Sequence, residues 1–348
     1  MSEFTLTGPP LRHFAYLLCG LATGLGMVTA ALAQGSPPLQ PNQLALVVND
    51  DEPNSVAIAE LYRVAHEIPP QNIAHVRIPG RPRKLGAAEF DELKKNIDRQ
   101  LPAEVRATLM VWTAPYAVEC NSITSAYTLG LDTDLCLKPS APGKDSPFFD
   151  NPNPSPAKAA ARISMLLPTE SVEQARELIA RGAARWMTPP KATAYYLVTS
   201  DKARSSRAQF FPQSATLPAK NLTIKTMKAD VLEGAQDVMI YQTVLARVTK
   251  LDTLRFLPGA LADHLTSSGG ALLDDAQMSS LRWLEAGATA SYGTVSEPYN
   301  YWQKFPNSLV LLKNYLGGAT AIEAYWSSVA WPGQGVFIGD PLAAPYRR

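Results

Sequence analysis

Short, uncharged apolar runs alternate with amphipathic segments along most of the 348-residue chain, and this alternation constrains the fold more than any other feature. Residues 44–48 (LALVV) and 107–113 (ATLMVWT) are typical of strands buried on both faces of a parallel sheet. Residues 87–100 (AAEFDELKKNIDRQ) and 171–182 (SVEQARELIARG) have the spacing of amphipathic helices. The sequence therefore predicts an α/β fold with a mostly parallel sheet and helices on both faces.

The N-terminal segment has the pattern of an export signal. Residues 14–33 (FAYLLCGLATGLGMVTAALA) carry no charge, follow Arg12 and end in a small-x-small cleavage motif. We expect a signal peptide at 1–33, cleavage near Ala33 and export to the periplasm or the exterior. We expect the protein to contact the membrane only through this segment. A linker at 34–43 and an α/β domain at 44–348 would remain. The alternative is a retained anchor, since about 20 apolar residues can span a bilayer.

Composition excludes several classes of protein. Apolar residues make up 46% of the chain and charged residues 18%, which excludes a disordered protein and allows a large core. The net charge of +1 provides no broad basic field, so we expect no nucleic-acid partner. The chain has no P-loop, GxGxxG, CxxC or HExxH motif, and we predict no cofactor. Many of the 29 prolines lie in 138–156, where we expect a long loop.

The cysteines allow two interpretations. Cleavage would leave Cys120 and Cys136, and an even count in an oxidising compartment favours a disulfide. Alternatively, Cys120 is a nucleophile with His264 as its base, since it follows a strand end where α/β proteins bind ligands. A disulfide would leave no thiolate for that chemistry.

Six ordered blocks of the chain resemble an uncharacterised family of exported bacterial proteins, which occurs in bacteria that carry the sorting enzyme exosortase. The blocks are NDDEPNSVAIAELY (49–62), VWTAPYAVECNSITSAY (111–127), RISMLLPTESVEQARELIARG (162–182), ADHLTSSGG (262–270), RWLEAGATASYGT (282–294) and EAYWSSVAWPGQGVFIGDPLA (323–343). The resemblance implies a role in cell-surface biology and carries no known activity.

A second resemblance is to the gingipain-type, caspase-like cysteine peptidases. It rests on residues 162–182, YYLVTSDKARSSR (195–207), WLEAGATASYGT (283–294) and GDPLA (339–343). It implies a caspase-like fold. In that group a histidine follows the strand that matches 237–244, and a cysteine nucleophile falls near 265–270. This chain has neither residue at those places, so the resemblance implies a domain without the peptidase dyad.

The segment around Asp263 and His264 contains the candidate catalytic residues. His264 could serve as a general base for Ser267 or Ser268, and the following glycines could offer backbone N–H groups to an anion. Neighbours on a strand point to opposite faces, so we do not expect Asp263 to orient His264. The alternative is a polar strand end followed by a glycine turn.

Polar and aromatic residues near other predicted strand ends are candidates for binding. We expect the strands ending at Asn49, Thr113, Val244 and Thr294 to be parallel, so that their C-terminal loops and His264 converge in one cleft. The candidate binding residues are Asn49, Asp50, Ser55, Trp112, Tyr116, Glu297 and Asn300. The aromatic loop at 297–302 could bind a sugar or peptide, or pack beneath other loops. The oxygen ligands of Asn49-Asp50-Asp51-Glu52 and of Asp132 and Asp134 could bind calcium, but solvated turns explain them as well, and we predict no metal.

Together these patterns predict an exported, non-peptidase binding or accessory protein linked to the cell surface or to exosortase-type sorting. Its partner would be a cell-surface protein or polysaccharide. One alternative is a hydrolase with a non-standard site around Asp263, His264 and Ser267 or Ser268. The other is a hydrolase that depends on Cys120.

Overall fold

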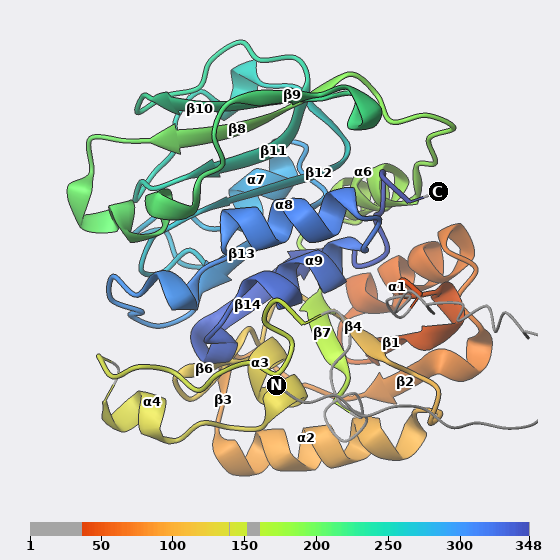
Figure 1. Ribbon diagram of the computed structural model, residues 1–348. Helices are drawn as coiled ribbons and strands as arrows, with labels where there is room; N and C mark the ends of the chain where they lie inside the picture. The colour runs from red at the N-terminus through yellow and green to blue at the C-terminus, as the bar shows by residue number, and fades with distance from the viewer. Residues whose placement is uncertain (1–36, 139, 152–160, 348) are drawn as a thin grey trace, which may run out of the picture. The chain divides into compact units, whose positions relative to one another are not determined.

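The computed structural model describes residues 37–138, 140–151 and 161–347 (Figure 1). These residues all belong to one unit, Gly35–Arg348. The expected signal segment, the start of the linker and part of the proline-rich loop lie outside the described residues. Within the ranges given, no helix has both the length and the apolarity needed to cross a membrane.

Eleven of the described strands form one sheet in the order β2-β1-β4-β7-β14-β13-β12-β11-β8-β10-β9 (Figure 1). Their bounds are β1 (Leu44–Asn49), β2 (Ile73–Val76), β4 (Ala107–Val111), β7 (Ile163–Leu166), β8 (Ala192–Val198), β9 (Ala215–Leu217), β10 (Leu222–Lys228), β11 (Val238–Thr243), β12 (Phe256–His264), β13 (Ala290–Thr294) and β14 (Gly335–Gly339). A smaller sheet joins β3 (Lys84–Leu85), β5 (Ala117–Val118) and β6 (Asn121–Ser122). β7, β14 and β13 are buried along their whole length, as is typical of strands that helices cover on both faces.

The large sheet changes direction at its centre. β14 runs parallel to β7 but antiparallel to β13, with Gly335 opposite Thr294 and Gly339 opposite Ala290. The expectation that the strands ending near Asn49, Thr113, Val244 and Thr294 are all parallel is therefore wrong. β1 and β4 therefore run in the direction opposite to β11 and β13. The loops that follow the first two strands lie at one end of the strands, and the loops that follow the other two lie at the opposite end.

Helices cover both faces. Their bounds are α1 (Pro53–Ala65), α2 (Ala87–Gln100), α3 (Ile123–Leu129), α4 (Asp134–Leu137), α6 (Val172–Ala183), α7 (Leu281–Glu285), α8 (Ser308–Leu316) and α9 (Ala321–Ser328). Figure 1 shows α3, α8 and α9 in front of the sheet, and α3 and α9 both contact β7. On the opposite face, α1 packs against β1, β4 and α6. The predicted α/β class, with a mostly parallel sheet and helices, is confirmed.

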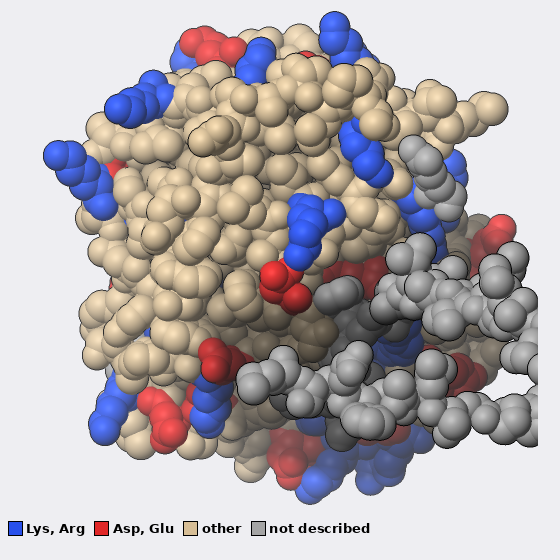
Figure 2. All heavy atoms as spheres, in the orientation of Figure 1, with Lys and Arg blue, Asp and Glu red and all other residues tan. Residues whose placement is uncertain are grey.

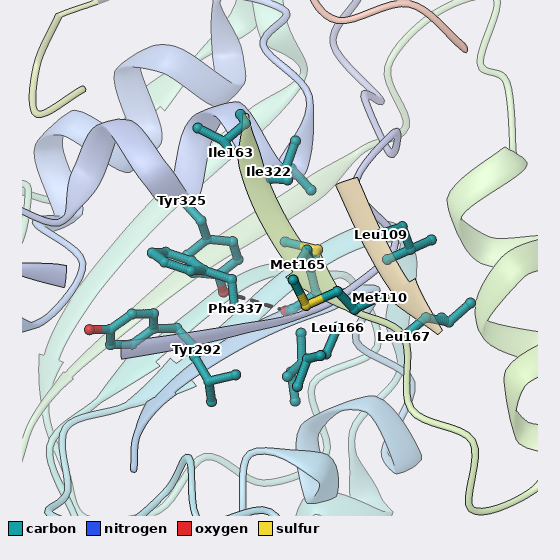
Figure 3. Packing of buried hydrophobic residues seen from close by; sticks show 14 of the residues in the cluster. Leu109, Met110, Ile163, Met165, Leu166, Leu167, Tyr292, Ile322, Tyr325 and Phe337 are labelled. Atoms are coloured by element: carbon teal, nitrogen blue, oxygen red, sulfur yellow. Dashed lines mark hydrogen bonds between the residues drawn. The ribbon is translucent and has the colours of Figure 1, made fainter. Parts of the chain in front are cut away.

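Figure 3 shows the part of the core where β4, β7, β14 and α9 meet. Leu109, Met165 and Phe337 are fully buried there, and Trp326 of α9 stacks on Phe337 with ring centroids 4.5 Å apart. The indole Nε1 of Trp326 donates to the Ser164 carbonyl at 3.0 Å, so its polar atom is also satisfied. This packing fixes α9 over the central strands.

Candidate functional site

Asp263 is a buried structural anchor at the end of β12. It forms an ion pair with the guanidinium of Arg207, and both side chains are almost completely buried. The Gln242 amide donates to Asp263 Oδ2 at 2.8 Å, and the same Arg207 donates to the Thr243 carbonyl at 2.8 Å. These contacts tie β11, β12 and η3 (Lys202–Phe210) together. Asp263 thus has its acceptors occupied by the protein itself.

His264 lies on the other face of β12 and has both ring nitrogens occupied. Trp283 Nε1 donates to Nδ1 at 2.9 Å, which places the ring proton on Nε2, 3.1 Å from the Met278 carbonyl. Burial, and to a smaller extent the charges of Arg207 and Arg204, lower the pKa of His264 from 6.5 to about 3. The imidazole is therefore neutral at physiological pH and held between Trp283 and Met278.

The hydroxyl-rich turn after β12 is organised by Gln277. Its Oε1 accepts from Thr266 Oγ1 at 2.6 Å and from the Ser268 amide at 3.0 Å. The Ser267 carbonyl accepts from Thr294 Oγ1 at 3.1 Å. The two ring nitrogens of His264 bond to Trp283 and to the Met278 carbonyl, so His264 is not paired with the hydroxyl of Ser267 or Ser268.

Cys120 and Cys136 form a disulfide with their Cα atoms 5.3 Å apart, as predicted. The bond closes a loop that contains α3 and α4. In this oxidised state Cys120 carries no thiolate, which removes the nucleophile from the Cys120-dependent hydrolase.

The candidates at and after the end of β1 form hydrogen bonds within the protein. Asn49 Oδ1 accepts from the Ile78 amide at 2.9 Å, and Ser55 Oγ accepts from the Asn49 amide at 2.9 Å. Asp50 Oδ1 lies 2.8 Å from His75 Nδ1. Ser55 lies within α1, whose N-cap is Glu52. These bonds connect the end of β1 with the chain after β2.

The other binding candidates also lie in separate surroundings. Trp112 is fully buried, and its Nε1 donates to the Pro115 carbonyl at 3.0 Å. Tyr116 is buried, which raises its pKa. Glu297 Oε1 accepts from the Tyr299 amide at 2.8 Å, and Asn300 is exposed. In the part of the chain with described coordinates, no group of three His, Cys, Asp or Glu side chains could hold a metal ion.

The aromatic loop packs beneath its neighbours. Trp302 contacts Phe210 and Phe149 at ring-centroid distances of 4.5 and 6.3 Å. Tyr301 packs against Trp331 at 5.4 Å, and its hydroxyl donates to the Ser140 carbonyl at 3.1 Å. Packing thus accounts for Tyr301 and Trp302, while Tyr299 is 45% exposed.

A cavity of about 260 Å³ lies beside the disulfide loop, and the sequence analysis did not identify it. Four segments enclose it: the disulfide loop, residues 143–147, and the turns η6 (Trp302–Lys304) and η7 (Pro332–Gln334). The lining residues are Asn121, Ser125, Leu129, Gly130, Leu131, Asp132, Leu135, Gly143, Lys144, Asp145, Pro147, Lys304, Trp331, Gly333 and Gln334. We call this space the disulfide-loop cavity.

Hydrogen bonds between distant segments fix the walls of the disulfide-loop cavity. Asn121 exchanges two bonds of 3.0 Å with the backbone of Asp132, which closes the loop as the disulfide does. Ser125 Oγ donates to the Pro332 carbonyl at 2.6 Å and joins α3 to η7. Trp331 Nε1 donates to Asp145 Oδ1 at 2.8 Å. These hydrogen bonds hold the segments that form the walls of the cavity in place relative to one another.

Gln334 and Lys304 are two of the buried polar residues in the lining of the cavity. Gln334 is 1% exposed, and its Nε2 donates to Ser296 Oγ at 2.9 Å and to the Glu297 carbonyl at 2.8 Å, but its Oε1 accepts no hydrogen bond. Lys304 is fully buried, with Nζ 5.2 Å from the centre of the Tyr301 ring. Burial lowers the pKa of Lys304 from 10.5 to about 8, and Glu297 opposes this shift.

The cavity was hard to find in the sequence because its lining comes from segments that are far apart in the chain. The block that contains Trp331 and Gln334 was noted only for its resemblance, and Lys304 stands in no motif. The one local signal was a lysine, usually an exposed residue, inside the apolar stretch 301–305 (YWQKF).

Comparisons with known proteins add no name: no family model, no curated protein and no solved structure matches this chain.

Proposed function

We propose that this is an exported, non-peptidase binding protein of the cell surface, and that its ligand occupies the disulfide-loop cavity. The observation that carries this proposal is the cavity of about 260 Å³ itself, whose walls come from separate segments and are held by hydrogen bonds between them.

The candidate catalytic groups support binding over hydrolysis. A general base needs a free ring nitrogen and a pKa near the working pH, whereas the His264 nitrogens are occupied and its pKa is about 3. Asp263 is paired with Arg207 on the opposite face of the strand. The resemblance to the exosortase-associated family favours a role at the cell surface and leaves the protein or polysaccharide partner open.

The test uses mature protein, residues 34–348, purified from an oxidising compartment. We expect it to bind isolated cell-envelope polysaccharide or envelope protein from an exosortase-bearing bacterium. Gln334→Met should weaken this binding, and Gln242→Met should not. The two glutamines are matched, since both are buried, both donate through Nε2 and both have an unpartnered Oε1, but only Gln334 lines the cavity.

Hydrolysis is tested in parallel with peptide and ester substrates. We expect no turnover. Turnover that disappears in His264→Gln would support the hydrolase around Asp263 and His264 and would overturn this proposal.

A further inference from the structure

We infer that the disulfide-loop cavity receives one aromatic side chain of a partner protein. The inference rests on the proposed function and specifies the partner that it left open, a protein rather than a polysaccharide. It is carried by the apolar surface of the cavity, by the internal bonding of its polar residues, by its closely packed walls and by its volume.

The surface that the cavity offers to a ligand is mostly apolar. The apolar side chains that line it are Leu129, Leu131, Leu135, Pro147 and Trp331. Cavities with apolar walls bind apolar molecules, as an engineered cavity lined by aliphatic and aromatic side chains binds benzene. The driving force is the removal of apolar surface from water. These walls therefore favour an apolar group.

The polar side chains of the lining are already bonded within the protein. Five of them form hydrogen bonds with other protein groups, namely Asn121, Ser125, Asp132, Lys144 and Asp145. Gln334 is bonded through Nε2, and Lys304 contacts the Tyr301 ring. A sugar in this cavity would lose hydrogen bonds from its hydroxyls to water and gain few in return, which argues against a polysaccharide.

Close packing holds the apolar walls in place. A Cβ atom on Gly143 would lie 2.7 Å from Trp331 Cβ, and one on Gly333 would lie 2.7 Å from Leu135 Cδ1. Trp331 and Leu135 thus lie directly against the backbone of other segments. Tyr301 also packs on Trp331, with ring centroids 5.4 Å apart. Walls held in this way need little rearrangement to receive a ligand, which favours binding.

The volume of the cavity suits a single large side chain. At about 260 Å³ it exceeds the roughly 150 Å³ that holds benzene, and it is smaller than the roughly 300–1,000 Å³ of sites for drug-sized ligands. A phenyl or indole group would fit, while the rest of a larger partner would stay outside. Aromatic side chains that fill preformed pockets are typical anchors of protein–protein interfaces.

The exposed part of the lining also suits a protein partner. Leu129 is 39% exposed, and the side chain of Lys144 is 71% exposed. An apolar pocket with a polar rim is the usual anatomy of a protein interface. Figure 2, in the orientation of Figure 1, shows uncharged residues over most of the face on which α3 lies. Charge on that face therefore favours neither an acidic nor a basic partner.

The experiment measures binding of defined probes to mature protein by saturation-transfer NMR and titration. The probes are the tripeptides Gly-Trp-Gly, Gly-Phe-Gly, Gly-Leu-Gly and Gly-Ser-Gly, each acetylated and amidated, together with methyl glucoside. We expect the tryptophan or phenylalanine peptide to bind more tightly than the leucine peptide. We expect it to bind roughly tenfold more tightly than the serine peptide or the glucoside.

Two variants of Leu129 test whether the peptide occupies the cavity. Leu129→Trp adds volume to the lining, and Leu129→Asn makes it more polar while keeping the side chain small, so the second variant remains informative if the first misfolds. Each should weaken binding of the aromatic peptide roughly tenfold. The matched controls are Leu309→Trp and Leu309→Asn, which should leave binding unchanged. Leu309 is also a partly exposed leucine near the end of a helix, at 48%, but it lies outside the lining.

The outcomes separate this inference from the proposed function. Tightest binding of the leucine peptide, the serine peptide or the glucoside would overturn the aromatic assignment, as would aromatic binding that neither Leu129 variant weakens. If no peptide binds, but envelope polysaccharide binds and Leu129→Trp weakens it, the inference fails and the proposed function stands. If neither the probes nor the envelope fractions bind, both proposals fail.

Discussion

Asp263 and His264 are adjacent in β12, and their side chains form hydrogen bonds on opposite faces of the sheet. Asp263 pairs with Arg207 and lies 3.4 Å from the hydroxyl of Tyr325 in α9, whereas His264 accepts from Trp283 in α7. The two residues thus anchor helices on both sides of the sheet. Their sequence suggested a possible acid–base pair, but their geometry serves the core.

Asp263→Asn should strongly destabilise the protein. The substitution leaves the buried guanidinium of Arg207 without a counter-charge, which costs about 3–5 kcal/mol in free energy of unfolding. Glu233→Gln is the control, because Glu233 pairs with Lys250 at an exposed site and should cost about 0–1 kcal/mol. Urea denaturation of both variants checks this. Equal, small losses would show that the buried pair has no special role.

His264 should make the protein sensitive to acid. Its pKa is about 3 in the folded protein and 6.5 when unperturbed, so the unfolded chain binds the proton first as the pH falls. The contribution of the neutral His264 to the free energy of unfolding is complete above pH 6.5. Below that pH the free energy of unfolding falls by roughly 1.4 kcal/mol per pH unit until about pH 3. His264→Gln keeps one donor and one acceptor and should flatten the stability curve between pH 6 and pH 4.

The control for this titration is His75→Gln. The side chain of His75 is 55% exposed and pairs with Asp50, so its loss should leave the steep acid dependence unchanged. An identical slope in wild type and His264→Gln between pH 6 and pH 4 would contradict the assignment.

Removal of the disulfide should lower both stability and ligand binding. The bond spans a sequence separation of 16 residues, and the chain-entropy model gives a stabilisation of about 3 kcal/mol for a loop of this size. The double variant Cys120→Ser/Cys136→Ser should lose about this much in thermal or urea unfolding. Alkylation of unreduced, denatured mature protein should label no thiol; labelling of both cysteines would disprove the bond.

Lys304 should destabilise the protein in a pH-dependent way. Its pKa falls from 10.5 to about 8 on folding, so the unfolded chain holds the proton more tightly. The resulting penalty is full below about pH 8 and disappears as the pH rises to 10.5. Lys304→Met removes the titrating group, so the stability of wild type relative to this variant should rise between about pH 8 and pH 10. A difference that does not change with pH would argue against a buried charge.

The fold class could be predicted from the sequence because it depends on local periodicity. The apolar runs of β1, β4 and β14 and the amphipathic pattern of α6 each determine their own element. The reversal of strand direction between β14 and β13 could not be predicted in this way. Whether β14 enters parallel or antiparallel to β13 depends on contacts between distant segments, and no local pattern records it.

The site illustrates the same limit. Cysteine count and compartment were sufficient to predict the Cys120–Cys136 bond. The disulfide-loop cavity needed the tertiary structure, since Ser125, Lys304 and Gln334 meet only after three separate segments have packed together. Strand-end reasoning pointed instead to Asn49, which accepts from the Ile78 amide after β2, and to Glu297, which accepts from the Tyr299 amide in its own turn.

The central position of β14 also has a consequence for how the chain folds. β14 follows every other described strand in the sequence, yet it sits between β7 and β13 and joins two groups of strands. Until residues 335–339 are in place, β7 and β13 each present an unpaired edge, which is a template for aggregation. Pairing of such distant segments is slow, because loop closure precedes the gain in contacts. The last of these strands to be synthesised is therefore the one that shields both halves of the nascent protein.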